Sequence, residues 1–248
     1  MRPDVVVNVA MSADGKISTR ERRQVKISGA KDFSRVDQLK ADSDAVMVGI
    51  GTVLADDPSL TVKSEEYRTI RRNRGMDEHP VRIVVDSTAR IPPESAILHK
   101  GAGKRIVAVS CSADPKKIAA LRSYATVIIA GKDEVDLVTL MDKLGEMGIR
   151  RVMVEGGGTL IAGLITAGLV NEIYTFIGNM IIGGKDSPSF VDGEGFILES
   201  GFCRLNLLEM NRIENGVLLH WNVQKPWKEK KCDFYPQDLQ YISCSMTV

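Results

Sequence analysis

The sequence predicts an α/β protein with a mixed, mostly parallel central sheet flanked by helices and a C-terminal antiparallel hairpin. Two observations predict this class. Short apolar, β-branched runs alternate with segments of helical periodicity through most of the 248 residues, as in parallel strands joined by crossover helices. Near the end, Glu214-Asn215-Gly216 separates two alternating segments, and Asn-Gly between such runs is a strong hairpin signal.

The N-terminal part of the chain contains three predicted buried strands. They are expected at 5–10, 44–49 and 81–86. The segment 28–41 reads as a helix with Ser28 as its N-cap, because Phe33, Val36 and Leu39 recur at helical spacing. The basic stretch 18–26 fits either a solvated loop or a flap over an anionic ligand.

The segment after the second strand combines a glycine turn with a charged region. A short helix is expected from near Gly51 and a strand at 59–63. Residues 64–79 are charged and poor in apolar residues, which predicts a surface loop.

The C-terminal part continues the alternation. Strands are expected at 105–110, 126–130, 152–154 and 172–177, helices from Pro115 and over 136–147, and hairpin strands at 204–212 and 217–223. Residues 183–188 read as a loop. We expect one domain over 1–225 and a surface extension or poorly ordered end over 226–248, where no clean period remains.

Composition narrows the function classes. The formal net charge of +1 gives no indication of nucleic-acid or membrane binding. No apolar run has the length of a membrane span, and the N-terminus has no signal-peptide pattern. The four cysteines are widely spaced without a CxxC pair, so no metal site is predicted. These features lead us to expect a cytoplasmic protein.

The stretch from Arg151 to Gly168 has the layout strand, glycine turn, helix. Its strand ends in Glu155, three glycines follow, and Thr159 opens an apolar helix. Glycines let a backbone approach a ligand closely, and a helix start offers free N–H groups to a phosphate. The alternative is an ordinary strand-to-helix turn.

A second strand-to-glycine junction lies at Gly49-Ile50-Gly51, too short for a dinucleotide fingerprint. Thr52 can offer its hydroxyl to a phosphate. Asp56 and Asp57 are paired acids before a proline, which also fits a simple turn. Since the first strand has no glycine fingerprint after it, the pattern argues against a standard dehydrogenase domain.

Four blocks in this order resemble the reductase of riboflavin biosynthesis, a module fused to a deaminase in bacteria and standing alone in archaea and fungi. The blocks are NVAMSADGK (8–16), VGIGTVLADDPSLT (48–61), RIVVDS (82–87) and VEGGGTL (154–160). They are specific together, and the likeness covers about residues 4–224. The stretch 182–196 is most similar to the archaeal stand-alone type.

The resemblance implies a dihydrofolate-reductase-like fold, a homodimer and NADPH as cofactor, with NADH as the alternative. The implied reaction reduces 2,5-diamino-6-ribosylamino-4(3H)-pyrimidinone 5′-phosphate to its ribitylamino product. Implied cofactor contacts are Ala10, Thr52, Asp56, Ser87, Gly156, Gly157, Gly158, Thr159 and Leu160. Implied substrate contacts are Leu60, Lys63 and Glu155. Bacterial members of the family carry a lysine near the position of Asn8, and this lysine is implicated in catalysis. Asparagine cannot act as a proton donor as lysine can.

Glu155 and Asp57 are the candidates for polarising or proton-relay roles, and a structural cap or turn is the alternative for Asp57. Other reactions stay open. They are reduction of the deaminated pyrimidine, reduction of dihydrofolate, and nucleotide binding without catalysis.

Overall fold

Nine strands form one sheet in the computed structural model, which describes residues 1–23 and 25–224. Their order is β5-β4-β3-β2-β6-β1-β7-β9-β8. The strands are β1 (Asp4–Ser12), β2 (Ala45–Gly49), β3 (Val81–Val85), β4 (Arg105–Val109), β5 (Thr126–Ile129), β6 (Arg151–Val154), β7 (Val170–Gly178), β8 (Leu205–Ile213) and β9 (Gly216–Val223). The strands from β5 to β7 run parallel, and β9 is antiparallel to β7 and β8. The expected mixed sheet with a C-terminal hairpin is confirmed.

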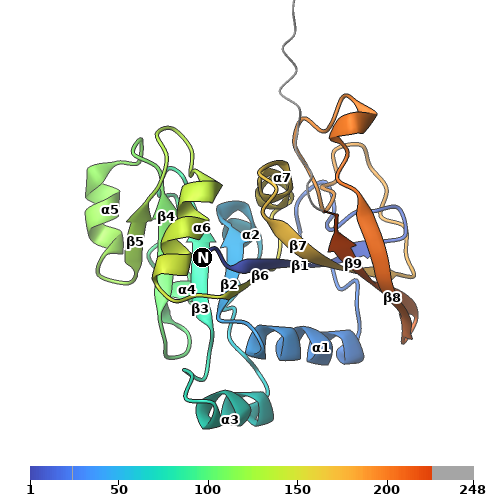
Figure 1. Ribbon diagram of the computed structural model, residues 1–248, viewed down its shortest axis with the longest axis horizontal. Coiled ribbons are helices and arrows are strands. Elements are labelled where there is room, and N and C mark those ends of the chain that lie inside the picture. The colour runs from blue at the N-terminus through green and yellow to red at the C-terminus, as the bar shows by residue number, and fades with distance from the viewer. Residues whose placement is uncertain (24, 225–248) are drawn as a thin grey trace, which may run out of the picture.

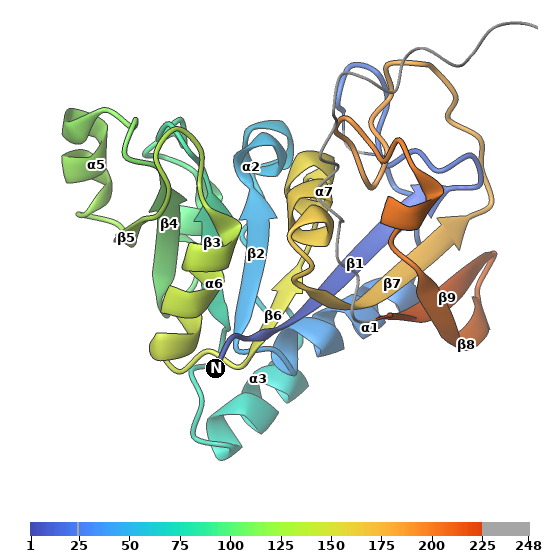
Figure 2. The same cartoon turned by 45° about the horizontal axis from the view of Figure 1, so that its top comes forward.

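Helices cover both faces of the parallel part of the sheet (Figures 1 and 2). They are α1 (Ala30–Ala41), α2 (Ile50–Asp56), α3 (Glu65–Asn73), α4 (Ala96–His99), α5 (Pro115–Leu121), α6 (Leu137–Glu146) and α7 (Gly158–Thr166). One apolar cluster joins α6 and α7 to the sheet, and a second joins α1, α2, α4 and α5 to the opposite face.

Strand β2 shows why both clusters form. Val46, Met47 and Val48 have no exposed surface. Met47 belongs to the α6–α7 cluster, and its two neighbours belong to the cluster on the α1 side. Side chains of a strand alternate between faces, so a continuous apolar run places one strand inside two cores.

Helix α3 corrects the predicted surface loop at 64–79. Ser64 caps it by accepting a hydrogen bond from Tyr67 N at 3.4 Å. Its one buried side chain, Arg71, donates to the carbonyls of Ala41 and Ser43 at 2.7 and 2.8 Å. The side chain that faces inward is thus charged, so a prediction from apolar periodicity does not find this helix.

The predicted strand at 59–63 is wrong, since these residues lie in no strand. Leu60 has a φ of 52° and Asp57 a φ of 42°. Such left-handed conformations interrupt an extended chain. The buried side chains of Leu60 and Val62 gave this segment its strand-like pattern.

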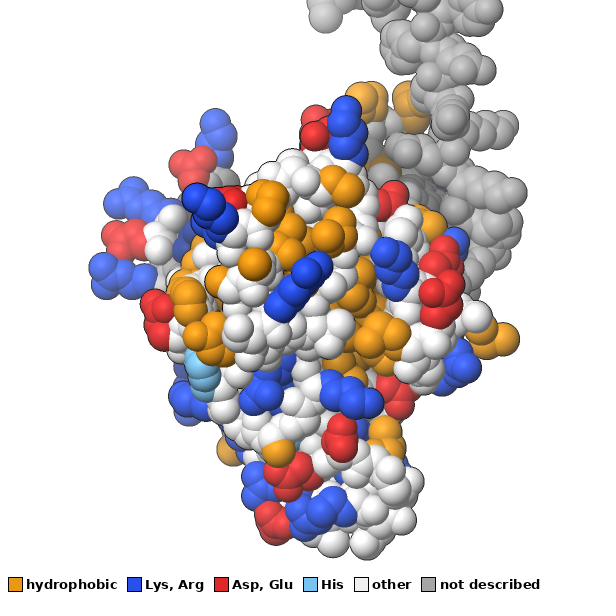
Figure 3. Space-filling view, turned by 90° about the vertical axis from the view of Figure 1, so that its left-hand side faces the viewer, with side chains coloured by type: hydrophobic (Ala, Val, Ile, Leu, Met, Phe, Trp, Pro, Cys, Tyr) orange, Lys and Arg blue, Asp and Glu red, His pale blue; other side chains and the backbone are white. Residues whose placement is uncertain are grey.

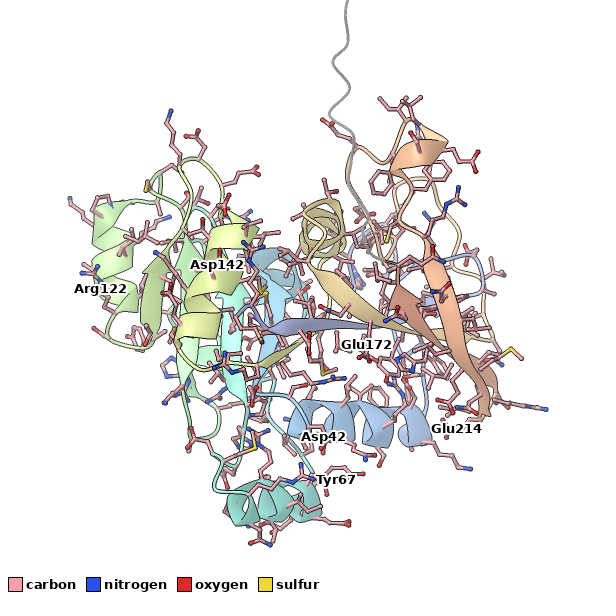
Figure 4. The ribbon with its side chains drawn as sticks, viewed as in Figure 1. Asp42, Tyr67, Arg122, Asp142, Glu172 and Glu214 are labelled. Carbon is pink, nitrogen blue, oxygen red and sulfur yellow. The ribbon has the colours of Figure 1, made fainter. Side chains whose placement is uncertain are left out.

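The N-cap of helix α1 is Gly29 rather than the predicted Ser28, and no side chain caps this helix start. The carboxylate of Glu214, from the turn of the β8–β9 hairpin, lies against Gly29 (Figure 4). An acidic group near a helix N-terminus is favourable. Its helical spacing predicts that Phe33 faces the core, but 55% of its surface is exposed.

The remaining expected strands and helices are confirmed within a few residues. The described residues of the basic stretch 18–26 lie outside helices and strands. Helix α4 was not expected. The predicted extension 226–248 lies outside the described residues. Within 1–23 and 25–224, no helix has the length and apolar character to cross a bilayer.

Candidate functional site

The two glycine turns meet at the carboxyl ends of β2 and β6. Gly49 N donates to Gly156 O at 3.4 Å. A Cβ added to Gly157 would lie 3.4 Å from Gly49 N, and Gly51 has open space beside it. The two turns therefore lie side by side at this edge of the sheet, where Gly51 is exposed and Gly157 is half-buried.

The glycine turn after β6 uses conformations that favour glycine. Gly156 and Gly157 have φ values of 115° and 91°. Gly157 is the N-cap of α7 and has no side chain with which to cap it. The N–H groups at this helix start are thus free for an anion.

A second segment closes one side of this turn. The backbone N of Asp192 donates to Gly158 O at 3.2 Å, and a Cβ on Gly158 would lie 2.6 Å from Asp192 Oδ2. The carboxylate repels an anion from the Gly158 side. An anion at this turn consequently belongs on the Gly156–Gly157 side.

Thr52, in α2, faces that open side. Its Oγ1 lies 3.8 Å from the position of a Cβ on Gly156. Thr159 is exposed in the first turn of α7, whereas the side chain of Leu160 is buried against the apolar core. Contacts of Leu160 with a cofactor are therefore limited to its backbone.

The two acids after α2 have different environments. Desolvation raises the pKa of the Asp56 carboxyl. Asp57 Oδ1 accepts a hydrogen bond from Ala96 N at 2.7 Å, which ties the end of α2 to the start of α4. This contact supports the structural alternative for Asp57, and its catalytic role stays a prediction.

Glu155 forms an ion pair with Lys40 of α1. Lys40 Nζ lies 2.9 Å from Glu155 Oε1, and the side chains are 15% and 14% exposed. The backbone of Glu155 is fixed by a 3.0 Å hydrogen bond from its N to Met47 O. The carboxylate is thus held at the end of β6, close to the glycine turn that follows it.

Lys63 lies near Lys40. Desolvation, followed by the charge of Lys40, lowers the pKa of the Lys63 ammonium. Its Nζ donates to the hydroxyls of Ser59 and Thr61, each at 2.8 Å. Both partners are neutral, so they leave the positive charge of the ammonium available to attract an anionic ligand. Leu60 is 3% exposed, which limits it to backbone contacts with a ligand.

Ser87 and Ala10 lie farther out along the same edge of the sheet. Ser87 Oγ accepts from Val135 N at 3.1 Å, and Ser110 Oγ donates to Ser87 O at 2.8 Å. Ser87 is thus at the ends of β3 and β4, on the far side of β2 from the turn after β6. Ala10 is half-buried near the end of β1. A ligand that reaches both residues must be extended.

A separate apolar pocket lies beside α5, on the face that Figure 3 shows with apolar side chains among Lys and Arg. Its lining is Cys111, Ala113, Pro115, Ile118, Ala119, Arg122 and Ile129. This lining offers a free thiol but no acid–base pair. In the described part of the chain, no group of three His, Cys, Asp or Glu side chains is arranged to hold a metal ion.

Sequence reasoning missed Lys40 and Asp192 as parts of the site. Lys40 lies in the last turn of α1, more than a hundred positions before its partner Glu155. Asp192 reaches Gly158 from a loop without secondary structure. Neither contact has a local sequence signal, because both depend on how separate elements pack.

The fold is that of an α/β protein whose candidate site residues lie along the carboxyl ends of its parallel strands. The chain belongs to the family described as RibD C-terminal domain, whose model matches residues 3–219. The expected resemblance is therefore confirmed.

Two archaeal relatives are similar over almost their whole lengths, and both are named 2,5-diamino-6-ribosylamino-4(3H)-pyrimidinone 5′-phosphate reductase. The protein of Archaeoglobus fulgidus is 49% identical over 216 residues, which are 87% of this chain and 96% of the relative. That of Methanothermobacter thermautotrophicus is 43% identical over 224 residues, 90% of this chain and 100% of the relative.

Solved structures share the fold. Acinetobacter baumannii RibD aligns with a TM-score of 0.72 at 24% identity, over 90% of this chain and 58% of that one. The riboflavin biosynthesis reductase Rib7 of Saccharomyces cerevisiae aligns with a TM-score of 0.66 at 22% identity, over 90% of each chain. The expected fold is confirmed by these likenesses.

Proposed function

We propose that this protein catalyses the NADPH-dependent reduction of 2,5-diamino-6-ribosylamino-4(3H)-pyrimidinone 5′-phosphate to the ribitylamino compound. The observation that carries the proposal is the placement of the Glu155–Lys40 pair directly beside the two joined glycine turns. This edge offers a cofactor site and a polar substrate site side by side. The names of the two archaeal relatives select the substrate among those that such a site can hold.

The residues present fit a dinucleotide. Gly156 and Gly157 leave a cradle that a Cβ would narrow, and Thr52 adds a hydroxyl. We assign the pyrophosphate to this cradle, with Gly158, Thr159 and the backbone of Leu160 completing the turn. Ala10, Asp56 and Ser87 complete the proposed cofactor contacts along the edge. When bound, the nicotinamide supplies hydride to C1′ of the sugar.

The substrate phosphate belongs near Lys63 in this proposal. Its ammonium is held by two neutral hydroxyls, and the Lys40 charge nearby raises the local positive potential. The backbone of Leu60 lies in the same segment. An ammonium binds phosphate as a point charge, without the bidentate geometry of arginine.

We assign the proton movement of ring opening to Glu155. Lys40 contacts Oε1, and no described residue donates to Oε2. That oxygen is thus available to a sugar hydroxyl or the exocyclic nitrogen of the substrate. Asp57 remains a second candidate. Because it accepts a hydrogen bond from Ala96 N, we expect its substitution to lower turnover less than it lowers stability.

We further propose a homodimer that uses the β8–β9 hairpin. On β8, Leu207 and Met210 are 50% and 67% exposed. They lie opposite Trp221 and Leu219 of β9, on one face of the hairpin. An apolar face of this kind on a sheet edge is typical of an interface.

Cofactor oxidation by the purified protein tests the proposal. We expect NADPH oxidation with the ribosylaminopyrimidine phosphate, slower oxidation with its deaminated form, and none with dihydrofolate. Replacing NADPH with NADH in the same assay tests the cofactor preference. NADPH binding without oxidation by any of the three compounds would instead favour the non-catalytic nucleotide-binding module.

A further inference from the structure

A row of polar side chains crosses the sheet beneath α1. Val7 of β1 pairs with Val154, the last residue of β6, so Asn8 and Glu155 are the next residues along the two neighbouring segments. On its other side Asn8 pairs with Tyr174 of β7. Neighbouring strands lie about 4.8 Å apart. The Asn8 amide and the Glu155 carboxylate are therefore adjacent groups on the face that α1 covers.

Helix α1 supplies one cation to each of these two groups. Lys40 pairs with Glu155, and Arg35 Nη2 donates to Asn8 Oδ1 at 2.7 Å. Arg35 is itself fixed on two sides. It pairs with Asp32 at 2.8 Å, whose side chain is 2% exposed, and its guanidinium lies 5.6 Å from the centre of the Tyr174 ring.

The Arg35 contact determines which way the Asn8 amide points. A guanidinium carries donors and no acceptor, so the group that faces it must be the amide oxygen. The amide nitrogen then points to the other side. Within residues 1–23 and 25–224, no residue accepts a hydrogen bond from Asn8 Nδ2. The amide N–H groups are thus left for a ligand.

The network around this pair extends into the sheet without using Asn8 Nδ2. Tyr174 stacks on His220 with ring centroids 4.0 Å apart, and His220 Nε2 lies 3.1 Å from Glu172 Oε2. Figure 4 shows Glu172 between β7 and α1. These contacts brace the Tyr174 ring against which Arg35 lies.

We propose that Asn8 Nδ2 donates a hydrogen bond to a sugar oxygen of the substrate beside Glu155, and that Arg35 is a positioning residue that fixes the amide for this contact. The inference rests on the proposed reductase function. Asn8 and Glu155 then form a neutral donor and an anionic acceptor side by side. Such a pair matches a ribosylamine, whose ring oxygen accepts while its hydroxyl groups donate.

Two substitutions of Asn8 test the donor. Asn8→Asp keeps an oxygen for Arg35 but removes the N–H groups, and Asn8→Leu removes them without adding a charge. We expect both to lower kcat/KM for the ribosylaminopyrimidine phosphate about tenfold, the loss of one hydrogen bond of about 1.4 kcal/mol. NADPH affinity should stay within twofold. Asn73→Asp, at the exposed end of α3, is the matched control and should behave as wild type.

Two substitutions of Arg35 test the positioning. Arg35→Met should lower kcat/KM severalfold, and Arg35→Lys, which retains a donor, should recover most of it. A purely structural Arg35 would instead make kcat/KM follow the melting temperature across both variants. This readout also decides the matter if the Asn8 variants fail to fold.

The outcomes separate the inference from the function on which it rests. A wild-type enzyme that does not reduce the substrate overturns both. An active wild-type enzyme whose Asn8→Asp or Asn8→Leu variant keeps full kcat/KM overturns only the inference. Equal kcat/KM in Arg35→Met and the wild type overturns the positioning role.

Discussion

Lys40 and Glu155 form an ion pair of 2.9 Å between the last turn of α1 and the turn after β6. Both side chains are mostly buried, so each depends on the other for its electrostatic environment. Removing one partner from a buried pair leaves an uncompensated charge. The pair therefore joins the packing of α1 to the chemistry of the site.

Glu155→Gln keeps the size of the side chain and removes its charge. We expect kcat to fall about 100-fold or more, the scale of a lost proton-transfer group, with NADPH affinity unchanged. Steady-state kinetics and a cofactor titration measure the two effects. Glu65→Gln, which changes an ion-paired carboxylate on α3, is the control. Unchanged turnover in Glu155→Gln would remove this residue from the mechanism.

Lys63→Gln should raise KM for the phosphorylated substrate about 10–100-fold, because a hydrogen bond to a charged group is lost. Lys63→Arg should retain most of the affinity. Since desolvation and the Lys40 charge lower the pKa of Lys63, its positive charge is lost at lower pH than for a free lysine. The wild-type KM should thus rise as the pH approaches that lowered pKa, and Lys63→Gln should lose this dependence. A pH-dependent rise that persists in Lys63→Gln contradicts the assignment.

Gly157→Ala places a side chain at a φ of 91° and 3.4 Å from Gly49 N. Gly75→Ala meets similar backbone strain, at a φ of 72°, with open space around it. Both should lose about 1 kcal/mol or more of stability. Only Gly157→Ala should also weaken NADPH binding, which a fluorescence titration measures. Equal NADPH affinities in the two variants would place the pyrophosphate elsewhere.

Asp14 ties two loops together at the end of β1. Its Oδ1 accepts from Ser12 Oγ and Ile182 N, at 2.6 and 3.0 Å, and Oδ2 accepts from Gly183 N at 2.7 Å. The Ser12 hydroxyl and then the Ile182 N–H lower the pKa of Asp14 to about 2.

The stabilisation by Asp14 has a defined pH window. A depressed folded-state pKa stabilises the fold above the unfolded pKa of about 3.9. This contribution is lost as the pH falls through about 2. Asp14→Asn should therefore differ from the wild type in melting temperature at pH 5 and converge with it near pH 2. A constant difference over this range would contradict the role of the charge.

Met210→Glu places a charge on the apolar face of the β8–β9 hairpin. If this face joins two copies, the variant should sediment as a monomer while the wild type sediments as a dimer. Met147→Glu, at another half-exposed apolar position, should leave the wild-type state unchanged. A dimeric Met210→Glu variant would place the interface on another surface.

Much of the fold was predictable because its strands are apolar and its turns carry strong signals. The run Val46-Met47-Val48 and the Asn215-Gly216 turn each specify their structure locally. Helix α3 was not predictable in this way, since its inward residue is Arg71, whose guanidinium binds carbonyls of another segment.

The candidate site was predictable where glycines mark close approach of two backbones, as at Gly49 and Gly157. It was not predictable where a partner comes from a distant element. The Arg35–Asn8 and Lys40–Glu155 contacts exist only because α1 packs across β1 and β6. Their residue types fit a solvated helix surface equally well in the sequence alone.

Hydride transfer to C1′ can be followed with NADPH that carries deuterium at C4 of the nicotinamide and with the ribosylaminopyrimidine phosphate as substrate. We expect a ribitylamino product with deuterium at C1′, detected by mass spectrometry and NMR, when the cofactor is labelled on the transferred face. Oxidation of the labelled cofactor on either face without deuterium at C1′ would contradict this expectation.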